Sequence, residues 1–349
     1  NTATSRPPTS NVRPSPAGTS PCLATGVNGR EEASSGGVMA VIGVELHRYD
    51  SRMTAASPVS SRSPVRLLVL DIDGTLTDSG HEVPIVARDA VARVVAAGVR
   101  VMIATGRRYR DALPIARVLG VDEPLVSASG ALVKRPTDHA TLSRAAFAPG
   151  VLEGVVRLIV ERGYEPILYS DSYAKGFDFH CRSLADIAED PGAYGGGLRE
   201  YLGRNRGLAD VVHDLHESPP EGVFAGFVMG PHAAMGGLEA DLENAFPGSL
   251  SLHTIKSPRY RDWMCEIAPV GVTKWSGVVE VAATWGIHPA EICAVGDDVN
   301  DLPMIREAGL GIAMGNARPE IQAEADLIVG TNDEGGLADV ADLVLAGLA

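Results

Sequence analysis

From Val65 onward, the chain alternates between short apolar runs and longer amphipathic segments. The run 65–70 is almost continuously apolar, which is typical of a strand covered on both faces of a parallel sheet. Segment 84–97 follows with a helical pattern and a proline at its first turn. The pattern continues with a strand at 100–104, a helix at 111–119 and a strand at 124–127. This order predicts a doubly wound α/β domain.

The same alternation returns near the end of the chain, whereas the middle differs. Late strands are expected at 291–295, 310–314 and 326–329, and late helices at 273–285, 302–308, 319–325 and 335–348. The middle has helical patterns at 151–161 and 233–246, strand patterns at 165–170, 223–229 and 249–255, and a glycine-rich loop at 192–197. We therefore predict a doubly wound parallel-sheet core built from 65–144 and 269–349. An α+β domain spanning 145–268 is inserted into it.

Residues 1–64 have a composition unlike the rest of the chain. Ser, Thr and Pro occupy 24 of these 64 positions, with no helical or strand period. Such a segment buries too little apolar surface to offset the entropy of ordering its backbone, so we expect a disordered leader. Met39 and Met53 are alternative initiators, and the Ser- and Arg-containing start also resembles a targeting peptide. A tail, a targeting peptide and a misassigned start therefore all remain open.

The acidic balance narrows the classes of partner. With 44 acidic and 30 basic residues the formal net charge is −14, which argues against nucleic acid and against anionic lipid. The longest uncharged run near the start, 36–44, is too short to span a bilayer. The four cysteines lack paired spacing, so we expect reduced thiols and a cytoplasmic protein. The oligomeric state is expected to be a monomer or a small homo-oligomer.

Polar residues follow the first two predicted strands where each strand ends. Asp71 and Asp73 come directly after the first strand, and Gly74 lets the chain turn behind them. Thr105 and Gly106 follow the second strand, where a hydroxyl and accessible N–H groups suit a phosphoryl oxygen. Each feature alone is also compatible with a simple strand-to-helix turn.

Two further junctions in the second half of the core add charge. Lys274 opens a helix, where a cation is unfavourable against the helix dipole unless an anion compensates it. Asp297, Asn300 and Asp301 follow another buried strand, and crowded carboxylates of this kind favour Mg²⁺ as a cofactor. Because the carboxyl ends of parallel strands meet at one edge of a sheet, these groups are expected to converge. Together they are the equipment for phosphoryl transfer.

The motifs in this order resemble those of the haloacid dehalogenase-like hydrolase superfamily. The segment 70–78, Leu-Asp-Ile-Asp-Gly-Thr-Leu-Thr-Asp, is similar to its first motif, and Thr105, Lys274 and 296–301 to the other three. Further phrases resemble its Cof-type (IIB) phosphatases: 104–107, 271–274, 313–317 and 331–334. The resemblance implies a Rossmann-like core with a cap of the C2 type inserted between the second and third motifs.

The resemblance also implies a role for each matching residue. Asp71 would attack the phosphorus and form an aspartyl-phosphate, while Asp73 would protonate the leaving alcohol and later activate water. Mg²⁺ would be held by Asp71, the main-chain carbonyl of Asp73 and Asp297, and Asp301 would support the water around the metal. Phosphoryl oxygens would be bound by a set of four residues: Thr105, Gly106, Lys274 and Asn300. The pKa of Asp71 is expected to be low beside the metal.

Two residues depart from the family pattern. Ser129 stands where many Cof-type members carry Asn, which affects contacts to the leaving group or the cap. Trp275 replaces a small residue, and its ring is expected to pack into the core or the cap hinge. In the inserted domain the polar candidates for substrate contact are Tyr169, Asp171, Tyr173, Lys175, His180, Arg182, Arg259 and Arg261. The guanidinium groups of Arg259 and Arg261 are expected to contact a second anionic group of the substrate.

The expected function is a Mg²⁺-dependent phosphatase that acts on a small phosphorylated metabolite, such as a sugar phosphate. A phosphotransferase or phosphomutase would use the same aspartyl-phosphate and is not separated from it by the sequence. A non-catalytic sugar-phosphate-binding module is a third reading. The presence of both Asp71 and Asp73 argues against that module, because binding alone does not need both carboxylates.

Overall fold

A five-stranded parallel sheet forms the core of the protein in this computed structural model, which describes residues 63–184 and 195–347. The strand order is β14-β13-β12-β1-β2, and every neighbouring pair is parallel. The strands are β1 (Leu67–Leu70), β2 (Arg100–Ile103), β12 (Ile292–Gly296), β13 (Leu310–Ala313) and β14 (Leu327–Ile328). The predicted doubly wound sheet is confirmed. The predicted leader lies outside the described residues except for 63 and 64.

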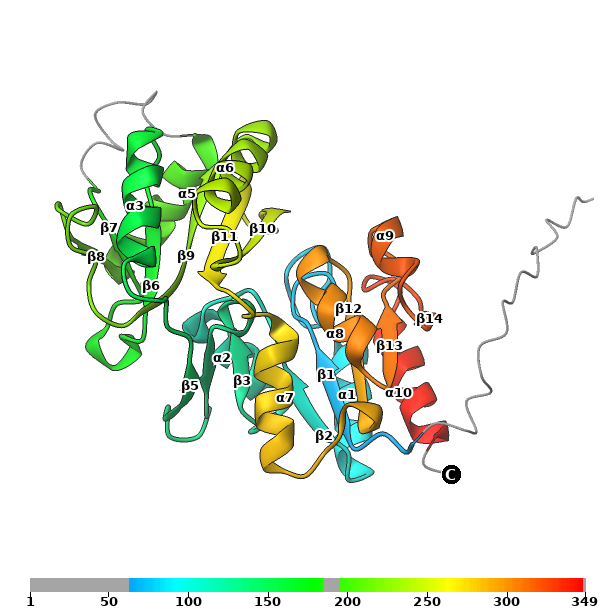
Figure 1. Cartoon of the computed structure of the whole chain (residues 1–349). Coiled ribbons are helices and arrows are strands. Elements are labelled where there is room, and N and C mark those ends of the chain that lie inside the picture. Colours follow the sequence, from blue (N-terminus) through cyan, green and yellow to red (C-terminus); the bar gives the residue numbers. More distant parts are fainter. Residues whose placement is uncertain (1–62, 185–194, 348–349) are drawn as a thin grey trace, which may run out of the picture. The chain divides into compact units, whose positions relative to one another are not determined.

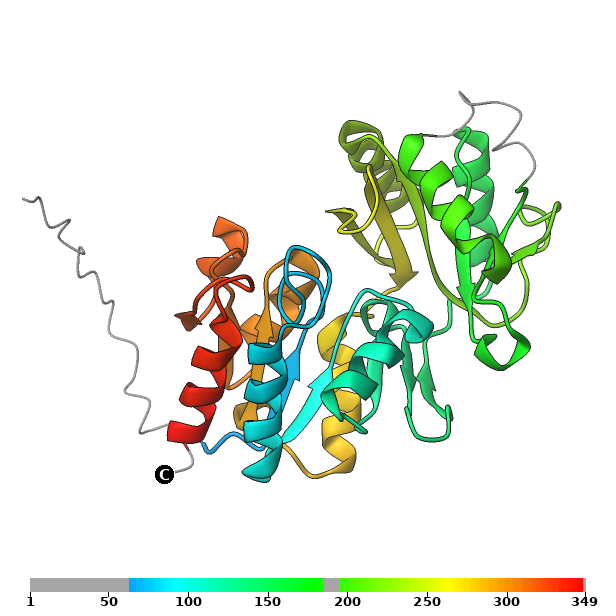
Figure 2. The same cartoon turned by 180° about the vertical axis from the view of Figure 1, so that it is seen from behind.

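Helices cover both faces of this sheet because its strands are apolar on both sides (Figures 1 and 2). Leu68 and Leu70 face α1, α2 and α10, whereas Leu67 and Val69 face α7. The core helices are α1 (Ile85–Ala96), α2 (Tyr109–Leu119), α7 (Lys274–Thr284), α8 (Leu302–Glu307), α9 (Pro319–Gln322) and α10 (Gly336–Ala346). Trp275 is partly buried against the cluster on the α7 face, as the sequence predicted for the core.

The third predicted strand, β3 (Leu125–Ser127), is attached to the parallel sheet by a single bridge between Ala104 and Val126. Its main partner is antiparallel β4 (Leu132–Lys134), which in turn pairs with β5 (Thr141–Arg144). The sequence did not predict β4 and β5. Both are short, and β5 is largely exposed, so neither has the apolar pattern that identifies a strand.

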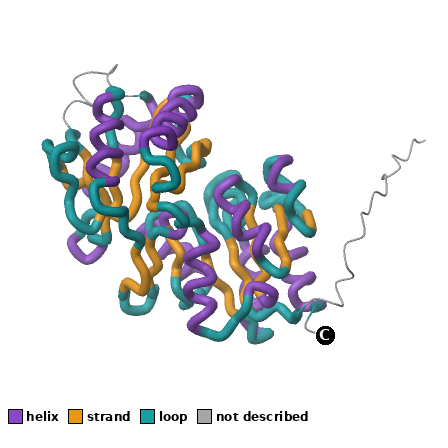
Figure 3. The backbone as a smooth tube through the Cα atoms, in the orientation of Figure 1, coloured by secondary structure: helices purple, strands orange, loops and turns teal. Residues whose placement is uncertain are grey.

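Between the two halves of the core, the chain forms a second sheet of six strands in mixed orientation. Its order is β10-β11-β9-β6-β7-β8. The strands are β6 (Ile167–Ser170), β7 (Phe179–Cys181), β8 (Ala209–Val211), β9 (Val223–Gly230), β10 (Leu250–Lys256) and β11 (Trp263–Pro269). Helices α3 (Val151–Glu161) and α6 (His232–Ala245) pack on one face, and α5 (Gly196–Asn205) packs on the other. Figure 3 shows this alternation of helices and strands along the backbone.

The inserted domain is thus confirmed as α+β, with corrections in detail. Part of the glycine-rich loop predicted at 192–197 lies outside the described residues, but Gly196 and Gly197 begin helix α5. Strands β7, β8 and β11 were not predicted. Short 3₁₀ turns occur at 128–130, 173–175, 206–208, 289–291 and 299–301. Among the described residues, no helix has both the length and the hydropathy needed to cross a bilayer.

Candidate active site

Asp71 lies immediately after β1 and is almost completely buried, with 4% of its surface exposed. Its main-chain N–H donates to the carbonyl of Val295 on the neighbouring strand, which continues the sheet pairing by one residue. The position therefore follows from the register of β1 against β12. A carboxylate held this deep at a strand end needs a charged partner.

Lys274 is that partner. Its Nζ lies 2.7 Å from Oδ1 of Asp71 and 2.6 Å from Oδ1 of Asp301, and it is itself 2% exposed. Thr273 holds the start of α7 through a capping box with Ser276, so the first residue of the helix is fixed in place. Two aspartates of the protein itself thus compensate the charge of this lysine at the start of the helix.

Asp301 uses both of its carboxylate oxygens inside the protein. Oδ1 accepts from Lys274, and Oδ2 accepts from the main-chain N–H groups of Asp297 and Asp298 at 2.9 and 3.0 Å. Its side chain is fully buried. Asp301 therefore orders the turn after β12, which agrees with a supporting position for this residue.

Asp297 is positioned by the loop that follows β1. Its Oδ1 accepts a hydrogen bond from the hydroxyl of Thr75 at 3.0 Å. Gly74, with φ +82°, passes so close that a Cβ there would lie 2.3 Å from Oδ2 of Asp297. Only glycine fits this left-handed position against a carboxylate.

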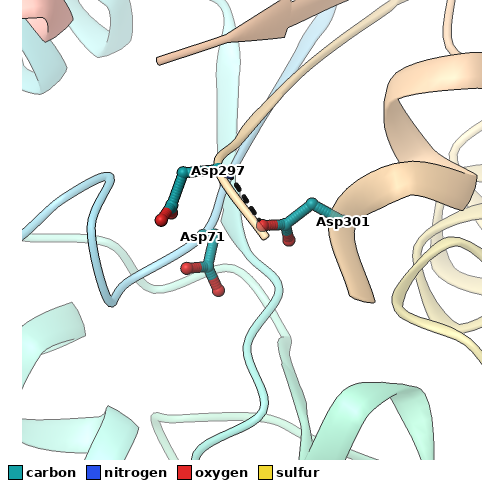
Figure 4. A group of neighbouring side chains, drawn as sticks. All are labelled: Asp71, Asp297 and Asp301. Atoms are coloured by element: carbon teal, nitrogen blue, oxygen red, sulfur yellow. Dashed lines mark hydrogen bonds between the residues drawn. The ribbon is translucent and has the colours of Figure 1, made fainter. Parts of the chain in front are cut away.

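Asp71, Asp297 and Asp301 can each offer one oxygen to a common point, since these oxygens lie within 4.8 Å of one another (Figure 4). Three carboxylates gather here against the single ammonium of Lys274. Hard oxygen donors with uncompensated negative charge fit a divalent cation such as Mg²⁺. The donor set therefore suits the metal that the sequence predicted, with Asp301 already committed to other partners.

Burial raises the pKa of Asp71 to about 7, and Asp301 and Asp73 add to this effect, although Lys274 opposes it. Burial likewise raises the pKa of Asp297 well above its usual range, with the charges of Asp301 and Asp71 contributing. Burial opposes the charge of Lys274, but its two aspartates outweigh burial and raise its pKa. The low pKa expected for Asp71 thus depends on a bound cation, because the protein alone has the opposite effect.

Thr105, Gly106 and Asn300 lie next to the aspartates, as the sequence predicted. Thr105 Oγ1 accepts from the main-chain N–H of Arg107 at 3.1 Å, which leaves its own proton for another acceptor. A Cβ on Gly106 would meet the amide nitrogen of Asn300 at 3.4 Å, so these two residues approach closely. All three line the same cavity as Asp71 and Lys274.

The loop 128–130 connects these junctions through an unusual backbone. Ala128 and Ser129 both have positive φ, at +48° and +53°. A Cβ on Gly130, with φ +101°, would lie 2.0 Å from the carbonyl oxygen of Thr273 at the start of α7. The N–H of Ser129 donates to the carbonyl of Thr105. The family Asn that Ser129 replaces is a residue type that tolerates this left-handed conformation.

Asp73 pairs with Arg107 through two hydrogen bonds. Nε of Arg107 lies 2.7 Å from Oδ2 of Asp73, and Nη2 lies 2.6 Å from Oδ1. His81 Nδ1 is 3.7 Å from the same carboxylate. The sequence placed Arg107 only within a family-like phrase, and its pairing with Asp73 was not predicted.

Two motifs that had no assigned role support the loop after β1. Asn316 Nδ2 donates to the carbonyl of Gly74 at 2.8 Å, and Asn332 Nδ2 donates to the carbonyl of Thr77 at 2.8 Å. The two asparagines are also joined, since the N–H of Asn332 donates to Oδ1 of Asn316. These contacts explain the family-like phrases at 313–317 and 331–334 as braces of the loop that carries Asp73.

A cavity of about 450 Å³ contains the predicted groups, except Asp301, and extends to the inserted sheet. Of the inserted-domain candidates, Tyr169 and Arg259 line it, whereas Arg261 does not. Of the two arginines expected to contact a second anionic group, the structure therefore places only Arg259 at the cavity. Asp171 pairs with Lys134, and His180 with Asp210.

Fold and site together define a class of α/β hydrolases that act on phosphate esters. The chain matches the haloacid dehalogenase-like hydrolase family over residues 68–340. Stress response protein YhaX of Bacillus subtilis (strain 168) is 32% identical over 287 residues, covering 78% of this chain and 91% of that protein. Phosphatase YwpJ of the same strain is 26% identical over 289 residues, covering 78% of this chain and 98% of its own length.

Solved structures agree with the fold. The HAD subclass IIB sugar phosphatase BT4131 matches with a TM-score of 0.62 and 20% identity, covering 80% of this chain and 98% of that one. The chain therefore belongs to the haloacid dehalogenase-like hydrolase family, and it is a phosphatase of this family, a phosphoric monoester hydrolase.

Proposed function

We propose that the protein hydrolyses a small phosphomonoester, a sugar phosphate or a related metabolite, through an aspartyl-phosphate on Asp71 with Mg²⁺ as cofactor. The observation that carries this proposal is that Asp71, Lys274 and Asp297 line one cavity together with Asp73, with Lys274 hydrogen-bonded to Asp71. The sugar-phosphate class is further supported by the likeness to a subclass IIB sugar phosphatase.

In the first step, a carboxylate oxygen of Asp71 attacks the phosphorus and the bond to the ester oxygen breaks. Asp73 donates its proton to that leaving oxygen, so the alcohol departs neutral. In the second step, Asp73 takes a proton from water while the water oxygen attacks the same phosphorus. The acyl-phosphate bond then breaks, which regenerates the Asp71 carboxylate and releases inorganic phosphate.

The remaining residues neutralise and position the phosphoryl group. Lys274, which is hydrogen-bonded to Asp71, would place its charge beside an oxygen of the phosphoryl group. Thr105 would donate a hydrogen bond to that group from its hydroxyl. Gly106 and Asn300 would contribute N–H donors. Asp71, Asp297 and the main-chain carbonyl of Asp73 would hold Mg²⁺, with Asp301 supporting them. When bound, this ion supplies charge neutralisation for the phosphoryl oxygens and for the crowded carboxylates.

We also propose that the inserted domain of residues 145–268 acts as the cap that selects the substrate. Its sheet supplies Tyr169 and Met264 to the lining of the cavity. In this division the core segments 65–144 and 269–349 carry the phosphoryl chemistry. Substrate choice and chemistry would then reside on different parts of the chain.

The test is phosphate release from a panel of phosphate esters, with Mg²⁺ or with EDTA. We expect turnover that EDTA abolishes and that Asp71→Asn reduces by about 10³-fold or more, since it removes the nucleophile. An added acceptor alcohol distinguishes hydrolysis from transfer, because a phosphotransferase would yield a new ester in place of free phosphate. No reaction with any ester by folded, Mg²⁺-binding protein would contradict the proposal.

A further inference from the structure

Glu266 is a carboxylate that the proposed reaction does not use, although it lies on the wall of the active-site cavity. It belongs to β11 of the inserted sheet, one residue beyond Cys265, which faces the α3–α6 side. Its own side therefore faces the cavity together with Met264. Neighbours of Glu266 in this lining include Tyr169 and Met264.

The hydrogen bonds of Glu266 are incomplete within the described part of the chain. Oε2 accepts from the hydroxyl of Ser129 at 2.9 Å. Oε1 has no hydrogen bond among residues 63–184 and 195–347, and it lies 3.3 Å from the position of a Cβ on Gly106. A carboxylate oxygen directed at the phosphoryl-binding residues thus remains available as an acceptor.

The surrounding charges favour a neutral donor as the missing partner. Burial raises the pKa of Glu266 and Asp298 adds to this effect, whereas the hydrogen bond from Ser129 and the charge of Lys274 oppose it. Ser129 donates to Glu266 from the left-handed loop, which orients the carboxylate and leaves Oε1 toward the cavity. A second phosphate or carboxylate on the substrate would be repelled there, whereas an alcohol hydroxyl would donate to Oε1 without bringing charge.

We propose that Glu266 is a specificity-determining residue, whose Oε1 accepts a hydrogen bond from a hydroxyl of the leaving alcohol and so selects phosphate esters of polyols. This inference rests on the proposed function, because it concerns the alcohol part of the same substrate. The residue that would select the substrate thus lies next to Gly106, on strand β11, which precedes Lys274 in the chain. A hydrogen bond that one ester makes with this buried carboxyl group and its alkyl partner lacks carries enough free energy to discriminate between them by about tenfold.

The test compares esters that differ only in their hydroxyl groups. Glycerol 3-phosphate is paired with propyl phosphate, and glucitol 6-phosphate with hexyl phosphate. We expect the native protein to favour at least one polyol ester over its alkyl partner by about tenfold or more in kcat/KM. Glu266→Gln, which keeps the side-chain volume, should bring that ratio close to one by losing activity on the polyol ester alone.

Two further variants keep the outcome interpretable. Ser129→Ala removes the hydrogen bond that orients Glu266 and should reduce the ratio less than Glu266→Gln does. Glu153→Gln, on an exposed position of α3, is the matched control and should leave the ratio unchanged. An unchanged ratio in Glu266→Gln, or equal losses on both esters, would overturn the inference while leaving the phosphatase intact. Absence of release from every ester would instead overturn the proposed function, and this inference with it.

Discussion

Two guanidinium nitrogens of Arg107 donate hydrogen bonds to the carboxylate of Asp73, with Nε 2.7 Å from Oδ2 and Nη2 2.6 Å from Oδ1. Both side chains are mostly buried, at 11% and 15% exposed, so water screens this pair only weakly. A planar bidentate pair fixes the direction of the carboxylate as well as its charge. Asp73 is thus held as an acceptor, and the two bonds fix the direction of the carboxyl group that the proposed reaction uses for proton transfer.

This pairing predicts that Arg107 positions the acid–base residue. We expect Arg107→Lys, which keeps the charge but loses the fork, to lower kcat for alkyl phosphates by about 10- to 100-fold, part of what acid catalysis contributes. The loss should be much smaller for p-nitrophenyl phosphate, because its leaving group departs without a proton. Steady-state kinetics with both esters measure the difference.

Arg93→Lys is the matched control for this measurement. Arg93 makes an ion pair with Asp342 on the core surface and does not line the cavity. The control should leave both esters unaffected. Equal losses on both esters in Arg107→Lys would show that Arg107 serves phosphate binding instead of the acid–base step.

The raised pKa values of Asp71 and Asp297 predict that Mg²⁺ stabilises the protein more at higher pH. The folded, metal-free protein holds protons at these carboxyls more tightly than the unfolded chain, whose aspartates titrate near 3.8. The stability that Asp71 contributes in this way is therefore complete below pH 4 and is lost as the pH rises through about 7, and the raised pKa of Asp297 acts in the same direction. Bound Mg²⁺ needs the ionised forms and displaces these protons, so its affinity rises with pH.

Thermal unfolding with and without Mg²⁺ at pH 5.5 and pH 8 measures this linkage. Below pH 7, each displaced proton weakens binding about tenfold per pH unit, which reduces the stabilisation at a fixed Mg²⁺ concentration. The increase in Tm should therefore be clearly larger at pH 8. Asp297→Asn should remove most of the increase at both values. An equal increase in Tm at the two pH values in the native protein would contradict this account.

Gly130 and Gly98 form a matched pair for testing the loop that links the site. Both have positive φ, but a Cβ on Gly130 would lie 2.0 Å from the Thr273 carbonyl oxygen, whereas nothing lies within 4 Å of one on Gly98. Gly98→Ala should therefore lower the free energy of unfolding by about 1 kcal/mol, through backbone strain alone. Gly130→Ala adds a steric clash and should lower the free energy of unfolding by about 3 kcal/mol or more.

Urea unfolding followed by circular dichroism measures both variants. Gly130→Ala should also lower kcat, because the displaced Thr273 caps the helix that begins with Lys274. Gly98→Ala lies at the end of α1 and should retain full activity. Similar losses of stability in the two variants would mean that the loop shifts to accommodate the methyl group.

The core was predictable from the sequence because its signals are local. Buried strands with apolar residues on both faces, and helices bounded by Pro and Gly, carry their pattern within a few residues. Strands β4, β5 and β8 lack such a pattern, because they are only three or four residues long and because β5 and β8 are not buried. Helix α5 begins with two glycines, which sequence reasoning takes as a loop.

The site was predictable as far as strand ends determine it. Asp71, Thr105 and Asp297 follow apolar runs, so their common position is given by the parallel sheet. The pairs Arg107–Asp73 and Ser129–Glu266 depend instead on how loops turn and on how the inserted sheet returns to the core. No local pattern reports such pairings, although the Arg following Thr-Gly was a usable signal.

The central claim is that Asp71 becomes phosphorylated during turnover. The most direct measurement is rapid mixing with a phosphate ester and Mg²⁺, followed by a denaturing quench, borohydride reduction and peptide mass spectrometry. An aspartyl-phosphate is reduced to homoserine, so the account predicts homoserine at position 71 in the native protein and none in Asp71→Asn. Phosphate release in the native protein without any modification at Asp71 would contradict it.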